Sequence, residues 1–160
     1  NPLNKTVNLS PEVFQGRSVA AAAIAAHECG HAVQHSTSYF WLGMRSKMVP
    51  VVNASSRIMQ FVFIASIFGM YSLSMGGNTI LLVLIGTQAV IASFAVITLP
   101  VEYDASRRAL VWLKGAGITN PQNHNMAEDA LKWAARTYLV AAVAAVTQLL
   151  YYVMIYLRRN

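Results

Sequence analysis

Two histidines and a glutamate, His27, Glu28 and His31, form an H-E-x-x-H arrangement in the first quarter of the chain. If this stretch is helical, the two histidines lie four residues apart on one face, and both imidazoles can reach one metal ion. Neutral imidazole is a common zinc ligand. A glutamate directly after the first histidine lies beside the water that the metal activates, outside the coordination shell. The pattern therefore predicts a site for one Zn²⁺ per chain, with Glu28 as general base.

A catalytic zinc site normally has three protein ligands and keeps one position open for water. The chain has six acidic residues, and four of them have other expected roles, as helix starts or as the base: Glu12, Glu28, Glu128 and Asp129. The remaining two, Glu102 and Asp104, follow Pro100, where an apolar segment ends. Their other interpretation is ordinary interfacial charge facing nearby arginines. The residues alone therefore predict a carboxylate third ligand and leave Glu102 and Asp104 both open.

The composition is typical of a membrane protein. Hydrophobic residues make up 56% of the 160 residues and charged residues only 11%, against about 25% charged in typical globular proteins. The formal charge of +6 comes from 12 basic residues that form no long run. We therefore interpret them as charges flanking membrane spans, and expect no nucleic-acid partner. Cys29 is the single cysteine, which excludes an intrachain disulfide, and we expect it to be a small buried residue of the motif.

The first third of the chain should carry the zinc helix. Residues 4–9 alternate polar and apolar side chains, which predicts a short half-exposed strand whose edge could bind an extended substrate. Ser10 and Ser18 are expected to cap two helices, the first ending at Gly16 and the second running from residue 19 to about residue 36. Residues 39–57 mix aromatic and basic side chains with Pro50, which should break the pattern, so this stretch is predicted to be an interfacial connector.

Two uncharged stretches are long enough to cross a bilayer. Residues 58–101 contain no charge, and Gly76, Gly77 and Asn78 divide them near the middle. Because spanning takes about 20 helical residues, we expect a hairpin of helices over 58–75 and 79–99 that turns at the glycines. A second uncharged stretch, 137–157, predicts a third span. The sequence thus indicates about three transmembrane helices.

The basic residues predict the orientation. Of the 12 lysines and arginines, all but Arg158 and Arg159 fall on the side of the membrane that holds the histidines. The positive-inside rule then puts the metal motif in the cytoplasm.

Two blocks of sequence resemble those of a known family. Residues 27–35, HECGHAVQH, and residues 99–110, LPVEYDASRRAL, are similar to the signature blocks of the bacterial membrane-bound, YugP-like neutral zinc metallopeptidases. Through the wider gluzincins, including HtpX-like membrane proteases, this resemblance implies that Glu102 is the third ligand. Ser106 stands where those proteins have an aspartate that orients a ligand histidine, so we expect Asp104 to take that role. Members usually carry a further N-terminal span, so we expect part of the protein to precede this chain.

Together these observations predict an all-α, polytopic membrane protein with a zincin-like helix, one short strand and about three transmembrane helices. We expect a single domain over 1–160. It is divided into the strand, zinc helix and connector (1–57), the transmembrane hairpin (58–101), the third-ligand helix and a loop (102–136) and the third transmembrane helix (137–160).

The expected function is that of a zinc endopeptidase in the bacterial inner membrane, with its active site facing the cytoplasm. Its partners would be the lipid bilayer and a peptide or protein substrate, including membrane-associated ones. Two alternatives stay open: a non-catalytic membrane protein with a structural zinc clamp, in which Asp104 or His35 fills the fourth position, and a zinc hydrolase of another amide or ester. The sequence does not specify the oligomeric state.

Overall fold

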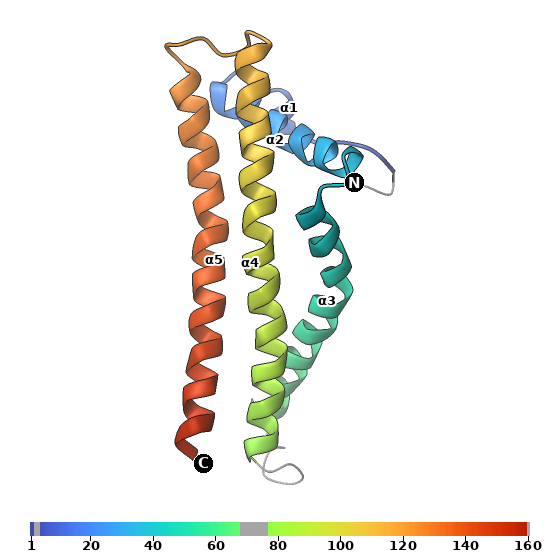
Figure 1. Ribbon diagram of the computed structural model, residues 1–160, viewed down its shortest axis with the longest axis vertical. Helices are drawn as coiled ribbons and strands as arrows, with labels where there is room; N and C mark the ends of the chain where they lie inside the picture. Colours follow the sequence, from blue (N-terminus) through green and yellow to red (C-terminus); the bar gives the residue numbers. More distant parts are fainter. Residues whose placement is uncertain (2–3, 68–76, 160) are drawn as a thin grey trace. The chain divides into compact units, whose positions relative to one another are not determined.

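The computed structural model describes residues 1, 4–67 and 77–159, and these form a series of helices (Figure 1). In chain order the helices are α1 (Pro11–Phe14), α2 (Val19–Ser36), α3 (Phe40–Ile67), α4 (Gly77–Gly115) and α5 (His124–Arg159). No strand occurs among the described residues. The all-helical expectation is therefore confirmed.

The short N-terminal strand was a wrong prediction. Asn4 and Lys5 form a turn, with Lys5 at a φ of 50°, outside the extended region. The N–H of Thr6 donates to the carbonyl of Asn1 at 3.2 Å, and the terminal ammonium of Asn1 donates to the carbonyl of Thr6 at 2.7 Å. A strand needs a neighbouring strand to pair with, and the described segments offer none. Because residues 4–9 form no strand, they also offer no strand edge to bind an extended substrate, and that expectation was wrong too.

Two serines begin the first helices as the sequence predicted. The Ser10 hydroxyl accepts from the N–H of Val13 at 3.4 Å, and the Ser18 hydroxyl accepts from the N–H of Ala21 at 3.1 Å. These bonds satisfy N–H groups that have no partner within the helix. Both helices therefore begin where the sequence predicted. The helix α2 also ends as predicted, whereas α1 ends at Phe14 and not at Gly16.

Three helices are long and apolar enough to cross a membrane, over Phe40–Ala65, Asn78–Gly115 and His124–Arg159. The break expected at Pro50 is wrong, because α3 continues through it, and α4 likewise continues through Pro100. Proline inside a membrane helix is tolerated where neighbouring groups take up the freed carbonyl. The expected glycine turn falls mostly on residues 68–76, outside the described residues, while Gly77 and Asn78 already belong to α4.

The chain divides into two compact units, Asn1–Met44 with Thr98–Leu139, and Arg45–Ile97 with Val140–Asn160. In the first unit, α2 and the second half of α4 share a core with the start of α5. Its buried members are mostly alanines: Ala23, Ala26, Ala109, Leu113, Ala127 and Leu131. Small side chains let helix backbones approach closely. In the second unit, the Gln88 side chain on α4 donates to the Ala145 carbonyl on α5 at 3.0 Å.

The helices α2 and α4 approach each other closely at Gly30. A Cβ atom added there would lie 2.7 Å from the carbonyl oxygen of Ala105 and 3.2 Å from its Cα. Only hydrogen fits between these backbones, so Gly30 fixes how near the metal motif comes to α4.

Candidate metal centre

Three side chains from two helices converge in the first unit. His27 and His31 come from α2 and Glu102 comes from α4. Glu102 Oε2 lies 3.2 Å from Nε2 of His27 and 3.5 Å from Nε2 of His31. The two imidazoles are nearly perpendicular, with ring centroids 4.7 Å apart. One donor atom from each residue lies within 4.8 Å of the others, a spacing that could hold a metal ion.

The cluster is closed on the glutamate side and open on the histidine side. The Glu102 side chain is 2% exposed, whereas those of His27 and His31 are 13% and 22% exposed. A buried carboxylate is costly without a partner of opposite charge or a hydrogen-bond donor. The two imidazoles face the Glu102 carboxylate, and a cation held between the three side chains would balance its negative charge more fully.

The other nitrogen of His31 is held by Gln34, one turn further along α2. Gln34 Oε1 lies 2.9 Å from Nδ1 of His31. The Gln34 amide nitrogen donates both of its hydrogens to α4, at 2.8 Å to the carbonyl of Val101 and at 2.9 Å to Oδ2 of Asp104. Only the oxygen of Gln34 is therefore left to face the imidazole of His31.

The other nitrogen of His27 lies beside a serine. Nδ1 of His27 and the hydroxyl of Ser106 are 3.1 Å apart. Ser106 thus contacts His27 from the position where the resemblance placed an aspartate. The expectation that Asp104 orients a histidine directly was wrong, because Asp104 binds Gln34 and two arginines instead.

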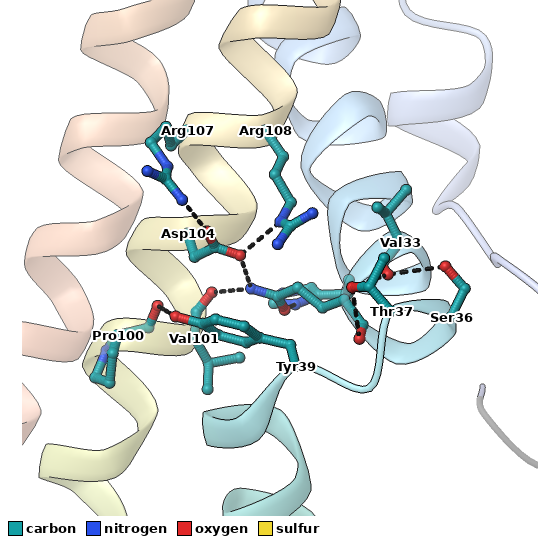
Figure 2. Close-up of polar contacts among 11 residues, drawn as sticks. Val33, Ser36, Thr37, Tyr39, Pro100, Val101, Asp104, Arg107 and Arg108 are labelled. Carbon is teal, nitrogen blue, oxygen red and sulfur yellow. Dashed lines mark hydrogen bonds and ion pairs between the residues drawn. The ribbon is translucent and has the colours of Figure 1, made fainter.

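Asp104 is nearly buried, and donors engage both of its oxygens (Figure 2). Arg107 Nη2 donates to Oδ1 at 2.5 Å, and Arg108 Nε donates to Oδ2 at 2.6 Å. The metal-compatible group contains Glu102 and does not contain Asp104. Of the two carboxylates that the sequence left open, the structure therefore brings Glu102 to the histidines.

Glu28 follows His27 directly and is exposed on α2. Burial acts to lower the pKa of His31. Hydrogen bonds to Glu102 and Gln34, together with the negative charges of Glu102 and Glu28, outweigh burial and hold the pKa of this imidazole above its ordinary value. The Glu28 carboxylate is thus close enough to act electrostatically on the cluster.

Several other sequence candidates lie elsewhere. Cys29 was expected to be buried, but it is exposed, and His35 is also exposed. The fourth histidine of the chain, His124, is the first residue of α5, and its Nδ1 lies 2.8 Å from the hydroxyl of Thr119. These residues do not belong to the metal-compatible group found among the described residues.

Sequence reasoning missed two features of this region. The role of Gln34 could have been inferred from its place three residues after His31, since residues three apart are neighbours on a helix.

The second feature is a cavity of about 630 Å³ along α2 and α4, whose lining residues are Ala26, Cys29, Gly30, Val33, Arg107, Arg108, Val111 and Trp112.

The residues fit a zinc ion. Two imidazoles and one carboxylate form a donor set found in catalytic zinc sites. The hydrogen bonds of Gln34 and Ser106 engage the Nδ1 atoms, which leaves the Nε2 atoms directed toward Glu102. Such outer contacts normally accompany metal-bound histidines.

Comparison with known proteins gives the family. Residues 1–157 match the family model described as "Putative neutral zinc metallopeptidase". The chain is 39% identical over 157 residues to the "Putative membrane protease YugP" of Bacillus subtilis (strain 168), a match that covers 98% of this chain and 67% of that protein. No solved structure matches significantly. A family model that matches nearly the whole chain, together with this relative, shows that the chain belongs to the family of neutral zinc metallopeptidases that includes YugP.

Proposed function

We propose that this protein is a membrane-bound zinc endopeptidase in which His27, His31 and Glu102 hold the metal. The observation that carries the proposal is the convergence of these three donors from two helices, within 4.8 Å of one another. Membership in a family of zinc metallopeptidases supports it independently. Glu102 is preferred over Asp104 as third ligand because arginines already engage both oxygens of Asp104.

Glu28 is the proposed general base. A zinc ion in the site would supply Lewis acidity, which acidifies a water molecule and polarises the scissile carbonyl. Glu28 takes the proton from the attacking water and later passes it to the leaving amine. Its exposed position, one residue after His27, supports this role, because an exposed carboxylate can contact both water and substrate. Glu102 stays buried and contributes negative charge to the metal site.

The proposed location is the bacterial inner membrane, with the site facing the cytoplasm. Three helices that could cross a membrane and the similarity to a membrane protease support the membrane assignment. The orientation rests on the charge distribution, with Arg158 and Arg159 alone on the far side. The proposed partners are the lipid bilayer and a peptide or protein substrate, with no nucleic acid.

The test compares three variants for zinc content, thermal stability and cleavage of an unstructured peptide or casein-like substrate in detergent. Glu28→Gln removes the proton acceptor but keeps the size of the side chain, so it should retain zinc and stability. Turnover should fall by about 10²–10⁴-fold. His27→Ala should lose zinc as well as activity. Glu12→Gln is the matched control, since Glu12 is an exposed glutamate of α1 outside the metal-compatible group, and it should cleave like the parent.

Three results would contradict the proposal. Unchanged cleavage by Glu28→Gln would eliminate Glu28 as the base. A parent protein that holds zinc but hydrolyses no peptide would favour the structural clamp, and hydrolysis of a different amide or ester would redirect the assignment to another zinc hydrolase.

A further inference from the structure

The Gln34 side chain is completely buried, with 0% exposure, and all of its hydrogen-bonding groups are used. We propose that Gln34 is a positioning residue that fixes the tautomer of His31 before metal binds, and that Asp104 acts on the metal site through Gln34. The expected effect on zinc affinity rests on the proposed function, whereas the expected tautomer of His31 does not.

The acceptors on α4 determine which way the Gln34 amide points. The Val101 carbonyl and the Asp104 carboxylate can only accept, and both lie within 2.9 Å of the same amide atom. A reversed amide would bring its oxygen against two acceptors inside a buried site, where an unmade hydrogen bond costs about 1–3 kcal/mol. The amide nitrogen therefore faces α4, and the amide oxygen faces His31.

The oxygen of Gln34 then decides the tautomer of His31. An oxygen acceptor 2.9 Å from Nδ1 requires the proton on that nitrogen. The competing contact, from Nε2 to Glu102 Oε2, is longer at 3.5 Å. Neutral His31 thus carries its proton on Nδ1 and presents the Nε2 lone pair toward the cluster, as a metal ligand must.

His27 provides an internal contrast. Its Nδ1 faces the Ser106 hydroxyl at 3.1 Å, which can either donate or accept. Its Nε2 lies 3.2 Å from Glu102 Oε2 and can donate to that carboxylate when no metal is present. The surroundings of His27 therefore permit both tautomers, whereas those of His31 permit one.

Two arginines keep Asp104 in its role as an acceptor. Arg107 and Arg108 each donate to one of its oxygens, so both oxygens serve as acceptors. Oδ2 accepts from both Gln34 and Arg108. A chain of contacts therefore runs from the arginines through Asp104 and Gln34 to His31, and it accounts for the burial of Asp104 without making it a ligand.

The first measurement needs neither metal nor substrate. Nitrogen-15 NMR of histidine side chains in the zinc-free protein in detergent, at a pH at which His31 is neutral, distinguishes Nδ1–H from Nε2–H imidazole. We expect His31 to be in the Nδ1–H form, opposite to the form that free histidine prefers. An Nε2–H signal for His31 would overturn the inference, whatever the variants show.

The second measurement compares zinc affinity and the His31 signal among variants. Gln34→Met keeps the length of the side chain but removes its hydrogen bonds, so both tautomers should appear and zinc affinity should fall by about 10–100-fold. Asp104→Leu keeps the branched shape of the side chain but removes the acceptor that Gln34 requires. It should shift both readouts in the same direction, and it keeps the test decisive if Gln34→Met fails to fold.

Tyr39→Phe is the matched control. It removes another side-chain bond to the α4 backbone, from the Tyr39 hydroxyl to the Pro100 carbonyl at 3.5 Å, without touching the cluster. Neither the tautomer nor zinc affinity should change. If Tyr39→Phe lowered zinc affinity as much as Gln34→Met, Gln34 would act only by holding α2 against α4, and the inference would be wrong. If the parent bound no zinc but His31 were in the Nδ1–H form, the proposed function would fail and the tautomer assignment would stand.

Discussion

Replacing Gly30 by alanine should separate the metal ligands without removing any of them. The new Cβ would lie 2.7 Å from the Ala105 carbonyl oxygen, whereas ordinary contacts begin at 3.4 Å. The obstacle is backbone, which cannot rotate away, so α2 and α4 must part locally by about 0.7 Å, the difference between these two distances. The two histidines lie on α2 and Glu102 lies on α4, so the gap opens within the cluster itself.

Stability is a poor readout for Gly30→Ala because two effects oppose each other. Alanine in place of glycine inside a helix gains about 0.5–1 kcal/mol, while overpacking costs about 1–3 kcal/mol. The unfolding free energy should therefore fall by at most about 2.5 kcal/mol. Zinc affinity is a more sensitive readout, since the distances between metal and ligands must hold to within about 0.2 Å.

The assays for Gly30→Ala are zinc affinity, by competition with a chromophoric chelator, and peptide turnover. Affinity should fall by about 10–100-fold, as when a residue supporting a ligand is lost. Turnover at saturating zinc should fall by up to about 10²-fold. Gly43→Ala is the control, because a Cβ there meets nothing within 4 Å. Gly43→Ala should leave zinc affinity unchanged. Parent-like zinc affinity in Gly30→Ala would refute the argument that the contact between Gly30 and Ala105 sets the geometry of the site.

Three further predictions concern other parts of the chain. Asn78→Cys on a Cys29→Ala background should react with a membrane-impermeant thiol reagent applied outside the cell; labelling only after the membrane is broken would place the site on the outer face. Ser106→Ala should weaken zinc binding by about tenfold, because His27 loses the partner of Nδ1, and chelator competition measures it; an unchanged affinity would show that this contact is dispensable. Gln88→Leu should change thermal stability by no more than about 1 kcal/mol, since hydrogen bonds between membrane helices are individually weak, and a loss of zinc in this variant would contradict the separation of the two units.

The features that the sequence predicted correctly depend on local chemistry. Ser18 starts α2 because its side chain caps an N–H three residues away, and the alanine-rich run that follows needs no distant partner to be helical. Two of the candidate spans contain the uncharged runs 79–99 and 137–157, as expected. The first, Phe40–Ala65, includes Arg45, Lys47 and Arg57 and begins within the stretch that was expected to be a connector. The structure also brings His27, His31 and Glu102 together, and their binding of zinc stays a prediction.

The features that the sequence did not predict depend on contacts between distant segments. The alternation over 4–9 is a real pattern, but without a neighbouring strand it cannot pair. The continuity of α3 and α4 through Pro50 and Pro100 depends on surroundings that a local rule ignores. The path from His31 through Gln34 to α4 exists only because α2 crosses α4 beside Gly30, and sequence spacing does not reveal that crossing.

The unbroken course of α4 bears on which peptide bonds the proposed endopeptidase could reach. Glu102 is the first charged residue after the uncharged run and lies three positions beyond Leu99 on the same helix. At 1.5 Å of rise per residue this is about 4.5 Å along the axis. If the apolar run lies in lipid, the scissile bond must come within about one helical turn of the hydrocarbon boundary. Few compact soluble proteins can bring an extended chain to that depth, whereas the segment directly flanking a transmembrane helix is already there.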